Sequence, residues 1–204
     1  MQHRIYFVRH GQTDYNDEGR VQGHVDIPLN EKGIRQAGQA RDFFRGNGVS
    51  FDRVYSSPLH RALKTAQIIS GLQDQKIRTD ARLQEMSFGV NEGHIIKELG
   101  QSMRNLFDDP VHFQAPEGGE SIEALQERCG SFLEDLARSL AGESRSVTIL
   151  TASHGACIRG LLSCIDHCPR ADFWRPHIDN CCIIRVLWDG NGYRIEEIFH
   201  PASK

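Results

Sequence analysis

Segments with the pattern of buried strands alternate with segments with the pattern of amphipathic helices along this chain of 204 residues. Short apolar runs predict strands at residues 4–8, 51–57, 146–152, 182–188 and 193–199, with a shorter one at 76–80. Helical spacing of apolar residues predicts helices at 29–44, 57–72, 121–142 and 155–165. Such alternation is typical of parallel strands whose connecting helices cover the sheet. We therefore predict one α/β domain over residues 1–204, with three layers and a mostly parallel central sheet.

Residues that start and stop helices support these boundaries. Asn30 is suited to be the N-cap of the first helix, Ser57 of the second and Ser121 of the third, and Gly142 is suited to end the third. The apolar positions that recur at helical spacing in the first helix are Ile34, Ala37 and Phe44. Residues 86–120 are interrupted by glycine and proline, and we expect one or two helices within 94–107. The last two strands are joined by "DGNG", which is a hairpin signal.

The composition excludes several classes of protein. Hydrophobic residues make up 39% and charged residues 25%, as in globular domains, and the net charge of −3 argues against a general nucleic-acid binder. No apolar run approaches the ~20 residues that a membrane span needs, and the N-terminus lacks the apolar core of a signal peptide. We expect a cytoplasmic protein with neither a membrane nor a nucleic acid as partner. The six cysteines form no C-x-x-C pair, so we expect reduced, mostly buried thiols.

Basic side chains follow three of the predicted strands. The first strand is followed by Arg9 and His10, the second leads to Arg61 after one helical turn, and the strand at 146–152 is followed by His154 and Gly155. Ligands of open α/β sheets bind beyond the carboxyl ends of the strands. Arginine donates paired hydrogen bonds that suit phosphate, and helix N-termini add backbone N–H groups. The pattern predicts an anion-binding pocket at one edge of the sheet.

The stretch "VRHGQTDYN" resembles the signature of the histidine phosphatase superfamily, the phosphoglycerate mutase-like proteins. The resemblance continues in the family's order through "GHVDIPLNEKGIRQA", "YSSPLHRALKTA", "LQEMSFGVNEG", "PEGGES" and "SHG", and so covers nearly the whole chain. It implies a phosphoglycerate mutase-like fold and a phosphohistidine mechanism with His10 as nucleophile. It also implies that Glu85 is the proton donor. Nearby carboxylates, Glu92 and either Glu117 or Glu120, are rivals for that role.

The chemistry of the side chains agrees with these roles. Neutral imidazole is a competent nucleophile near pH 7. Arg9, Arg61 and His154 would neutralise the charge that spreads over the phosphoryl oxygens, so we expect no metal and no cofactor. The residues expected to bind substrate are Asn16, Thr13, Gln22, Gly23 and Gly155; Gln22 and Gly23 match a loop that lines the substrate entrance in the family. A loop-capping role for the Thr13 hydroxyl is an equal alternative.

The choice within the family is between a phosphatase and a mutase. The family's mutases carry an insertion between the acid segment and the "GGES" segment, whereas here about 30 residues separate Glu85 from Gly118. This favours hydrolysis of a small phosphomonoester, and the chain resembles small bacterial members such as α-ribazole phosphatases. Residues 86–120 are expected to form a cap over the pocket that sets substrate specificity, with 94–113 as its centre. Its phenylalanines, Phe88, Phe107 and Phe113, could contact an apolar substrate part or pack in the core, and its basic residues in reach of a second phosphate are Lys97 and Arg104.

The sequence contains features of three other kinds of protein. Cys164 and Arg170 have the C-x5-R spacing of cysteine-dependent phosphatases, but the cysteine follows a helix and the loop carries Asp166, which would repel phosphate. Ten histidines raise the question of a metal site, but no H-E-x-x-H pattern is present. A non-catalytic module that binds a phosphorylated ligand would be expected to have lost His10 or Glu85. A homodimer paired through the terminal hairpin or an edge strand stays open.

Overall fold

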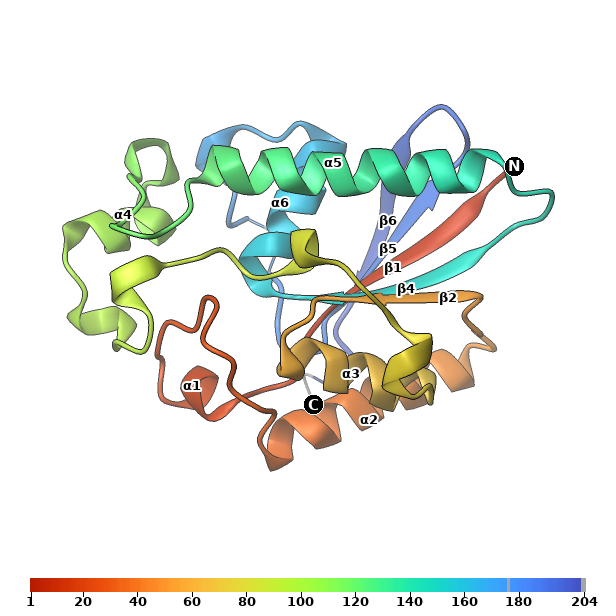
Figure 1. The fold of residues 1–204 in the computed structure, drawn as a ribbon, viewed down its shortest axis with the longest axis horizontal. Helices are drawn as coiled ribbons and strands as arrows, with labels where there is room; N and C mark the ends of the chain where they lie inside the picture. Colours follow the sequence, from red (N-terminus) through yellow and green to blue (C-terminus); the bar gives the residue numbers. More distant parts are fainter. Residues whose placement is uncertain (176, 203–204) are drawn as a thin grey trace.

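A computed structural model describes residues 1–175 and 177–202, which form a six-stranded sheet with helices on both faces (Figure 1). The predicted domain also included residues 176, 203 and 204, which lie outside the described part. The strands are β1 (His3–Arg9), β2 (Arg53–Ser56), β3 (Arg78–Thr79), β4 (Thr148–Ser153), β5 (Ile183–Trp188) and β6 (Tyr193–Phe199).

The sheet is mostly parallel, as predicted. Its order is β3-β2-β4-β1-β5-β6, and the first four of these strands run parallel to one another. Strand β5 is antiparallel to β1, and β6 is antiparallel to β5 because the two form the predicted hairpin. The carboxyl ends of β1, β2 and β4 therefore lie at one edge of the sheet.

Two pairs of helices cover the sheet and confirm the three layers. Helices α2 (Glu31–Gly46) and α3 (His60–Ser70) lie on one face, and α5 (Ile122–Ala141) and α6 (Gly155–Asp166) on the other (Figure 1). The period of two along a strand supplies both cores. In β1, Ile5 and Phe7 pack in the cluster under α5 and α6, whereas Tyr6 and Val8 pack in the cluster under α2 and α3.

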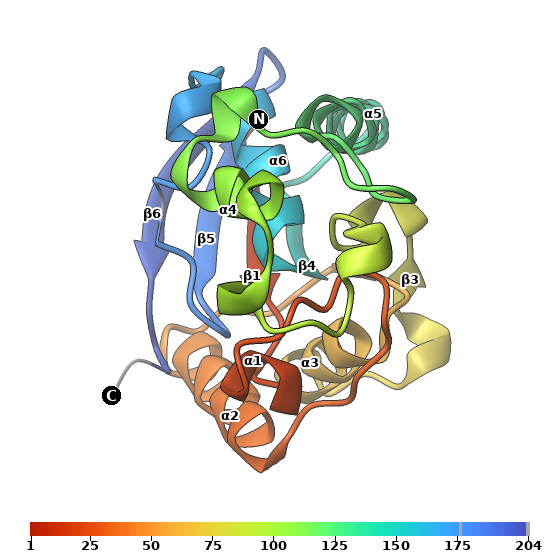
Figure 2. The ribbon, with the colours of Figure 1, turned by 90° about the vertical axis from the view of Figure 1, so that its left-hand side faces the viewer.

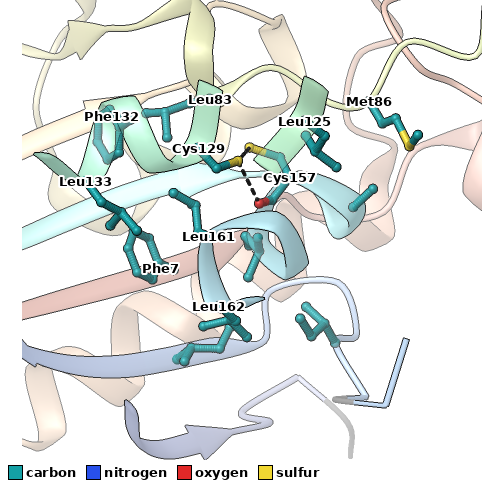
Figure 3. Packing of buried hydrophobic residues seen from close by; sticks show 14 of the residues in the cluster. Phe7, Leu83, Met86, Leu125, Cys129, Phe132, Leu133, Cys157, Leu161 and Leu162 are labelled. Carbon is teal, nitrogen blue, oxygen red and sulfur yellow. Dashed lines mark hydrogen bonds between the residues drawn. The ribbon is translucent and has the colours of Figure 1, made fainter. Parts of the chain in front are cut away.

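The thiols of Cys129 in α5 and Cys157 in α6 meet in the first of these clusters (Figure 3). Their Sγ atoms lie 3.9 Å apart, and both residues are free cysteines with no exposed surface. Leu125, Phe132 and Leu161 pack around them. Burying a side chain of this kind contributes about 1.5–3 kcal/mol to stability.

Most helix ends are where the sequence predicts them. The side chain of Asn30 accepts a hydrogen bond from the N–H of Gly33, the Ser121 side chain accepts one from Ala124, and Gly142 is the C-cap of α5. Ser57 was wrongly predicted as an N-cap, because α3 begins at His60 and its N-cap position is Leu59, with no side-chain bond.

Two further predictions differ from the structure in detail. Ile34 is 46% exposed and does not join the buried face of α2, which consists of Gly33, Ala37, Ala40 and Phe44. Small residues lie on this face because the N-terminus of α2 approaches the loop after β1 closely: a Cβ on Gly33 would lie 2.1 Å from the carbonyl oxygen of Gln12. The strand predicted at 76–80 is only the two-residue β3 at the sheet edge.

Residues 86–120, here named the cap segment, lie beyond the carboxyl ends of β1 and β4 and face the viewer in Figure 2. The segment holds one α-helix, α4 (Gln101–Asp108), and the short 3₁₀ turns η3 (Gly89–Asn91), η4 (Ile96–Glu98) and η5 (Pro110–His112). An isolated β-bridge between Arg20 and Ile95 joins it to the loop that follows β1. That loop contains the one-turn helix α1 (Asp14–Asp17). None of the helices in the described residues is long and apolar enough to cross a membrane.

Candidate active site

A cavity of about 320 Å³ opens at the carboxyl ends of the parallel strands, beneath the cap segment. Eight of the ten predicted site residues line it: Arg9, His10, Asn16, Gln22, Gly23, Arg61, Glu85 and Gly155. A larger hollow of about 560 Å³ lies at the opposite end of the sheet, beside Arg4 and Thr148 at the starts of β1 and β4. It contains none of the predicted site residues, so the smaller cavity is the candidate site.

The ring of His10 is held in one orientation. Its Nδ1 lies 2.7 Å from the carbonyl oxygen of Gly11, which can only accept, so Nδ1 carries the proton and Nε2 presents its lone pair. The pKa of His10 is well below its ordinary value because the ring is buried and because Arg61 and Arg9 repel a positive charge there. His10 is therefore neutral near pH 7, as a nucleophile must be.

The last residue of β1, Arg9, lines the cavity. Its Nη1 donates to the carbonyl oxygen of Ile178 at 2.7 Å, which fixes the guanidinium group. Its Nε is buried and has no hydrogen-bond partner among the described residues. Burial lowers the pKa of Arg9, but arginine remains charged in proteins. A buried donor without a partner is costly, so this atom is suited to receive a ligand oxygen.

Arg61 is completely buried at the start of α3 and also lines the cavity. Its Nη2 and Nη1 donate to the carbonyl oxygens of Gly23 and Val25 at 2.7 and 2.8 Å. Burial lowers its pKa to about 10, which leaves it positively charged at neutral pH. Arg61 thus both places a positive charge beside His10 and holds the loop around Gly23.

His154 lies behind the cavity wall and does not line it. Its Nδ1 accepts from Nε of Arg61 at 3.2 Å, so its Nε2 carries the proton and donates to Oγ of Ser57 at 2.8 Å. Burial, followed by the charge of Arg61, lowers the pKa of His154 well below its ordinary value. Its ring centroid is 5.1 Å from that of His10. Both ring nitrogens of His154 therefore have a hydrogen-bond partner. The partner Ser57 was predicted to be a helix N-cap, whereas in the structure its hydroxyl accepts from His154.

The carboxyl group of Glu85 sits on the N-terminus of α6. Its Oε1 accepts from the backbone N–H groups of Met86, Ala156 and Cys157 at 3.0–3.1 Å. Its Oε2 has one longer contact, 3.3 Å, to the N–H of Ala156. Helix N-termini stabilise negative charge and fix the position of the group that binds them. Oε2 is therefore the oxygen of Glu85 that is less engaged and suited to exchange a proton with a ligand.

The three rivals of Glu85 do not line the cavity. Oε1 of Glu92 accepts from the N–H groups of His24 and Phe88, and Oε2 accepts from Val25, so this carboxylate ties the loop after β1 to the cap segment. Glu120 forms an ion pair with Arg128 at 2.6 Å. Glu117 is exposed to solvent.

Glycine is required beside Glu92. Gly23 has a positive φ of +52°, and a Cβ there would lie 2.0 Å from Oε1 of Glu92. An L-residue with a side chain would be strained in this conformation and would also collide with the carboxylate. Gly23 thus allows the loop to approach Glu92 closely while its carbonyl oxygen accepts from Arg61.

Thr13 acts through its neighbours. It is buried, caps α1, and its Oγ1 donates to Oε1 of Gln22 at 2.9 Å. The Oδ1 atom of Asn16 accepts from the backbone N–H of Thr13 at 3.2 Å and from Nδ2 of Asn180 at 3.3 Å. These bonds fix the side chain of Asn16, which lines the cavity. The structure thus shows the loop-capping role of Thr13, while Asn16 and Gln22 lie on the cavity wall.

Several lining residues were not predicted. They are Arg20, Val21, Ile96, Ala156, Arg159, Trp174, His177, Ile178 and Asp179. The sequence held one signal for this set: Arg159 is the single charged residue in the apolar helix "GACIRGLLSCI". A buried arginine in such a helix requires a partner, which makes it a candidate site residue. Among the cap phenylalanines, Phe88 and Phe107 line the cavity whereas Phe113 is buried in the core. Lys97 and Arg104 are exposed and do not line it.

The rival chemistries gain no support. Cys164 donates to the carbonyl oxygen of Gln126 from within α6, and burial raises the pKa of its thiol, which disfavours a thiolate nucleophile. Arg170 is paired with Glu123 instead of facing that sulfur. Within residues 1–175 and 177–202, no three His, Cys, Asp or Glu side chains gather as a metal site would require.

Comparisons with known proteins agree with the geometry. The family model of the histidine phosphatase superfamily (branch 1) matches residues 5–200. The chain is 33% identical to a putative phosphoserine phosphatase 2 of Hydrogenobacter thermophilus, over 92% of this chain and 90% of the relative. It is 35% identical to a probable phosphoglycerate mutase GpmB of Escherichia coli, over 95% of this chain and 91% of the relative.

Solved structures show the same fold. A phosphoserine phosphatase mutant of Entamoeba histolytica, in complex with phosphoserine, superposes with a TM-score of 0.81 at 28% identity, covering 96% of this chain and 95% of the other. A putative alpha-ribazole-5'-P phosphatase of Escherichia coli gives a TM-score of 0.83 at 26% identity, covering 98% and 97%. The chain belongs to branch 1 of the histidine phosphatase superfamily and is an enzyme of that family.

Proposed function

We propose that this enzyme hydrolyses a small phosphomonoester through a phosphohistidine intermediate on His10, without a metal ion. The observation that carries the proposal is the hydrogen bond from Nδ1 of His10 to Gly11, because it leaves the Nε2 lone pair as the reactive atom. The partnerless Nε of Arg9 and the positive charge of Arg61 lie at the same cavity. Fixed positive groups of this kind stabilise the charge of a phosphoryl group in transfer, which is the role that Mg²⁺ has in other enzymes.

In the first step, Nε2 of His10 attacks phosphorus while the bond from phosphorus to the ester oxygen breaks. The alcohol oxygen takes up a proton from Oε2 of Glu85, and the phosphoryl group stays on His10. The negative charge on the phosphoryl oxygens is met by Arg9, Arg61 and the amino group of Asn16. His154 acts on this step as a positioning residue, since it orients Arg61 through its Nδ1.

In the second step, Glu85 is a carboxylate and takes a proton from water. The water oxygen attacks phosphorus, the bond from phosphorus to Nε2 breaks, and inorganic phosphate leaves. This restores the neutral ring of His10 and the protonated Glu85. The cap segment covers the cavity during both steps, and its Phe88 and Phe107 contact the alcohol part of the substrate.

A mutase is the second candidate, since one relative is named a probable phosphoglycerate mutase. A mutase must bind a second phosphate group and retain the phosphoryl group against water. The basic residues of the cap, Lys97 and Arg104, are exposed and lie off the cavity wall. This favours hydrolysis.

The function is tested with nitrophenyl phosphate in the presence of EDTA. We expect steady turnover by the wild type, a phosphorylated peptide containing His10 after rapid quenching, and no turnover by His10→Ala. Circular dichroism of the variant should match that of the wild type. Turnover by His10→Ala, or complete loss of wild-type activity on adding EDTA, would contradict the proposal.

The role of Glu85 is tested with two leaving groups. Nitrophenolate leaves with little help, whereas an alkyl alcohol needs a proton. Glu85→Gln should therefore slow the first step with an alkyl phosphate by ~10²–10⁴-fold and the same step with nitrophenyl phosphate much less. The first step must be followed in single turnovers, because Glu85 also assists the second. Glu117→Gln serves as the matched control, since its carboxylate is exposed and lies outside the cavity. An equal effect of Glu85→Gln on both substrates would refute the acid role.

A further inference from the structure

Arg159 projects from α6 back into the active-site cavity. It lies one helical turn after Gly155, and helical side chains lean toward the N-terminus, so its guanidinium group returns to the start of the helix. There its Nη1 donates to the carbonyl oxygen of Gly155 at 2.9 Å. Arg159 is only 8% exposed and lines the same cavity as Arg9 and Glu85.

Arg159 and Arg9 both lie beside Gly155 at the start of α6. A Cβ built on Gly155 would lie 3.6 Å from Nη1 of Arg159 and 3.6 Å from Nε of Arg9. Burial, followed by the charge of Arg9, lowers the pKa of Arg159 to about 10, so both groups are charged at neutral pH. Two like charges held close together in a buried place repel each other, and an anion bound beside them relieves that repulsion.

An aromatic surface fixes the guanidinium plane of Arg159. Its Cζ lies 4.6 Å from the ring centroid of Trp174. Trp174 is itself held by the cap segment: its Nε1 donates to the carbonyl oxygen of Leu106, and its ring lies 4.9 Å from that of Phe107. A guanidinium group stacked in this way keeps the N–H groups of its edge directed in its plane, where they suit a carboxylate. Such preorganisation reduces the entropy lost on binding.

The charges around the cavity leave room for a second anionic group. Four arginines and two carboxylates line it, namely Arg9, Arg20, Arg61 and Arg159 with Glu85 and Asp179. Arg20 forms an ion pair with Glu18 at 2.5 Å, so the arginines whose charge faces the cavity are Arg9, Arg61 and Arg159. Arg9 and Arg61 are the groups assigned to the phosphoryl oxygens. Arg159 is a third positive charge at the same cavity, and it suits a second, smaller anionic group.

We propose that Arg159 binds a carboxylate on the alcohol part of the substrate, and that the enzyme acts on phosphate esters of small hydroxy acids or hydroxy amino acids. The inference rests on the proposed function for the position of the phosphoryl group beside His10. Arg159 is then a specificity-determining residue, distinct from Arg9 and Arg61, which bind the phosphoryl oxygens. Phe88, Ile96 and Phe107 close the rest of the cavity and limit the size of the alcohol.

The test measures binding, so that it does not depend on turnover. Phosphoserine and phosphoethanolamine differ only in the carboxylate, and 3-phosphoglycerate differs from glycerol 3-phosphate by a carboxylate in place of a hydroxymethyl group. Each ligand is titrated calorimetrically into the His10→Ala protein. We expect the carboxylate to tighten binding ~10–100-fold within each pair, as is usual for a hydrogen-bonded charged group. Adding Arg159→Gln should remove this preference and change binding of the carboxylate-free ligand by less than about threefold.

Two further variants separate a specific role from a structural one. Arg159→Lys keeps the charge but not the planar fork, and should retain part of the preference. Arg104→Gln removes an exposed arginine of the cap segment and should retain all of it. The proposal is overturned if His10→Ala shows no preference for the carboxylate, or if Arg159→Gln weakens both members of a pair equally. Turnover of nitrophenyl phosphate by the wild type with either of these results would show that the hydrolase function stands and that only the carboxylate site is wrong.

Discussion

Acidification from about pH 7 to about pH 5.5 is expected to destabilise the unliganded protein, because two histidines are buried in neutral form. The folded-state pKa values of His10 and His154 lie well below the ordinary value. Between those values and about pH 6.5, the unfolded chain binds a proton on each ring that the folded chain does not. The stability from these rings is therefore complete above about pH 6.5 and is lost as the pH falls toward the folded-state pKa values.

The size of the effect follows from linkage. For a ring that stays neutral in the folded state, the free energy of unfolding falls by about 1.3 kcal/mol between pH 7 and pH 5.5, and by about 2.5 kcal/mol for the two rings together. This is a large part of the ~5–15 kcal/mol that stabilises a typical domain. The pKa of His3 is also lowered by burial. His3 therefore makes a smaller pH-dependent contribution to the free energy of unfolding. This contribution is the same in the wild type and in variants of His10 and His154.

Urea unfolding followed by tryptophan fluorescence, repeated across this pH range, measures the effect. His10→Asn and His154→Asn should each reduce the pH-dependent loss by about 1.3 kcal/mol, and the double variant should retain only the smaller contribution of His3. The comparison uses the slope against pH, so any constant cost of a substitution cancels. If His10→Asn lost as much stability on acidification as the wild type, His10 would not be held neutral and its assignment as a ready nucleophile would be wrong.

Three other perturbations have defined outcomes. Arg9→Lys keeps the charge but loses the Nε donor, so the barrier to phosphorylation of the enzyme should rise by about 2–4 kcal/mol in single-turnover kinetics, and an unchanged rate would exclude contact with phosphate. Gly33→Ala should destabilise the protein by about 1–3 kcal/mol, because its Cβ would lie 2.1 Å from a backbone oxygen. Gly38→Ala in the same helix has no atom nearer than 4.0 Å to its Cβ and should stabilise the protein by about 0.5–1 kcal/mol. Urea unfolding of the two variants measures the difference. A thiol reagent should label Cys164 and Cys168 in the native protein and the four buried cysteines only after denaturation, and rapid labelling of all six would contradict the packing.

The sequence predicts much of this fold because local signals and burial agree. The run at 4–8 and the run at 146–152 are mostly apolar on both faces, as strands covered on both sides are, and both are central in the sheet. Asn30 and Ser121 could be recognised as N-caps because their function depends on the next three residues only. Ser57 has the same local features, yet its hydroxyl accepts from His154, which is 97 positions away. No local pattern distinguishes these two uses of a serine.

The site was predictable to the extent that its residues occupy strand ends or family motifs. His10 and Arg9 follow β1 directly, and Glu85 stands in a recognisable segment. Arg159 and Trp174 have no such position: their roles depend on how the start of α6 faces the cap segment. The same limit applies to Thr13, whose sequence position beside the motif does not show that its hydroxyl faces Gln22 instead of the cavity.

The N-terminus of α6 joins the parts of the proposed mechanism. His154, the residue before α6, orients Arg61. The first backbone N–H groups of α6 donate to Oε1 of Glu85. Arg159, one turn into the helix, directs its guanidinium group back to the carbonyl oxygen of Gly155 beside the cavity. Cys157, whose N–H binds Glu85, packs its thiol against α5 with no exposed surface. The proposed proton donor and the proposed carboxylate-binding arginine therefore both depend on the start of α6, one through a hydrogen bond and the other as part of the helix. A substitution that shifts this end of α6 should accordingly change protonation of the alcohol oxygen and selectivity for the alcohol together.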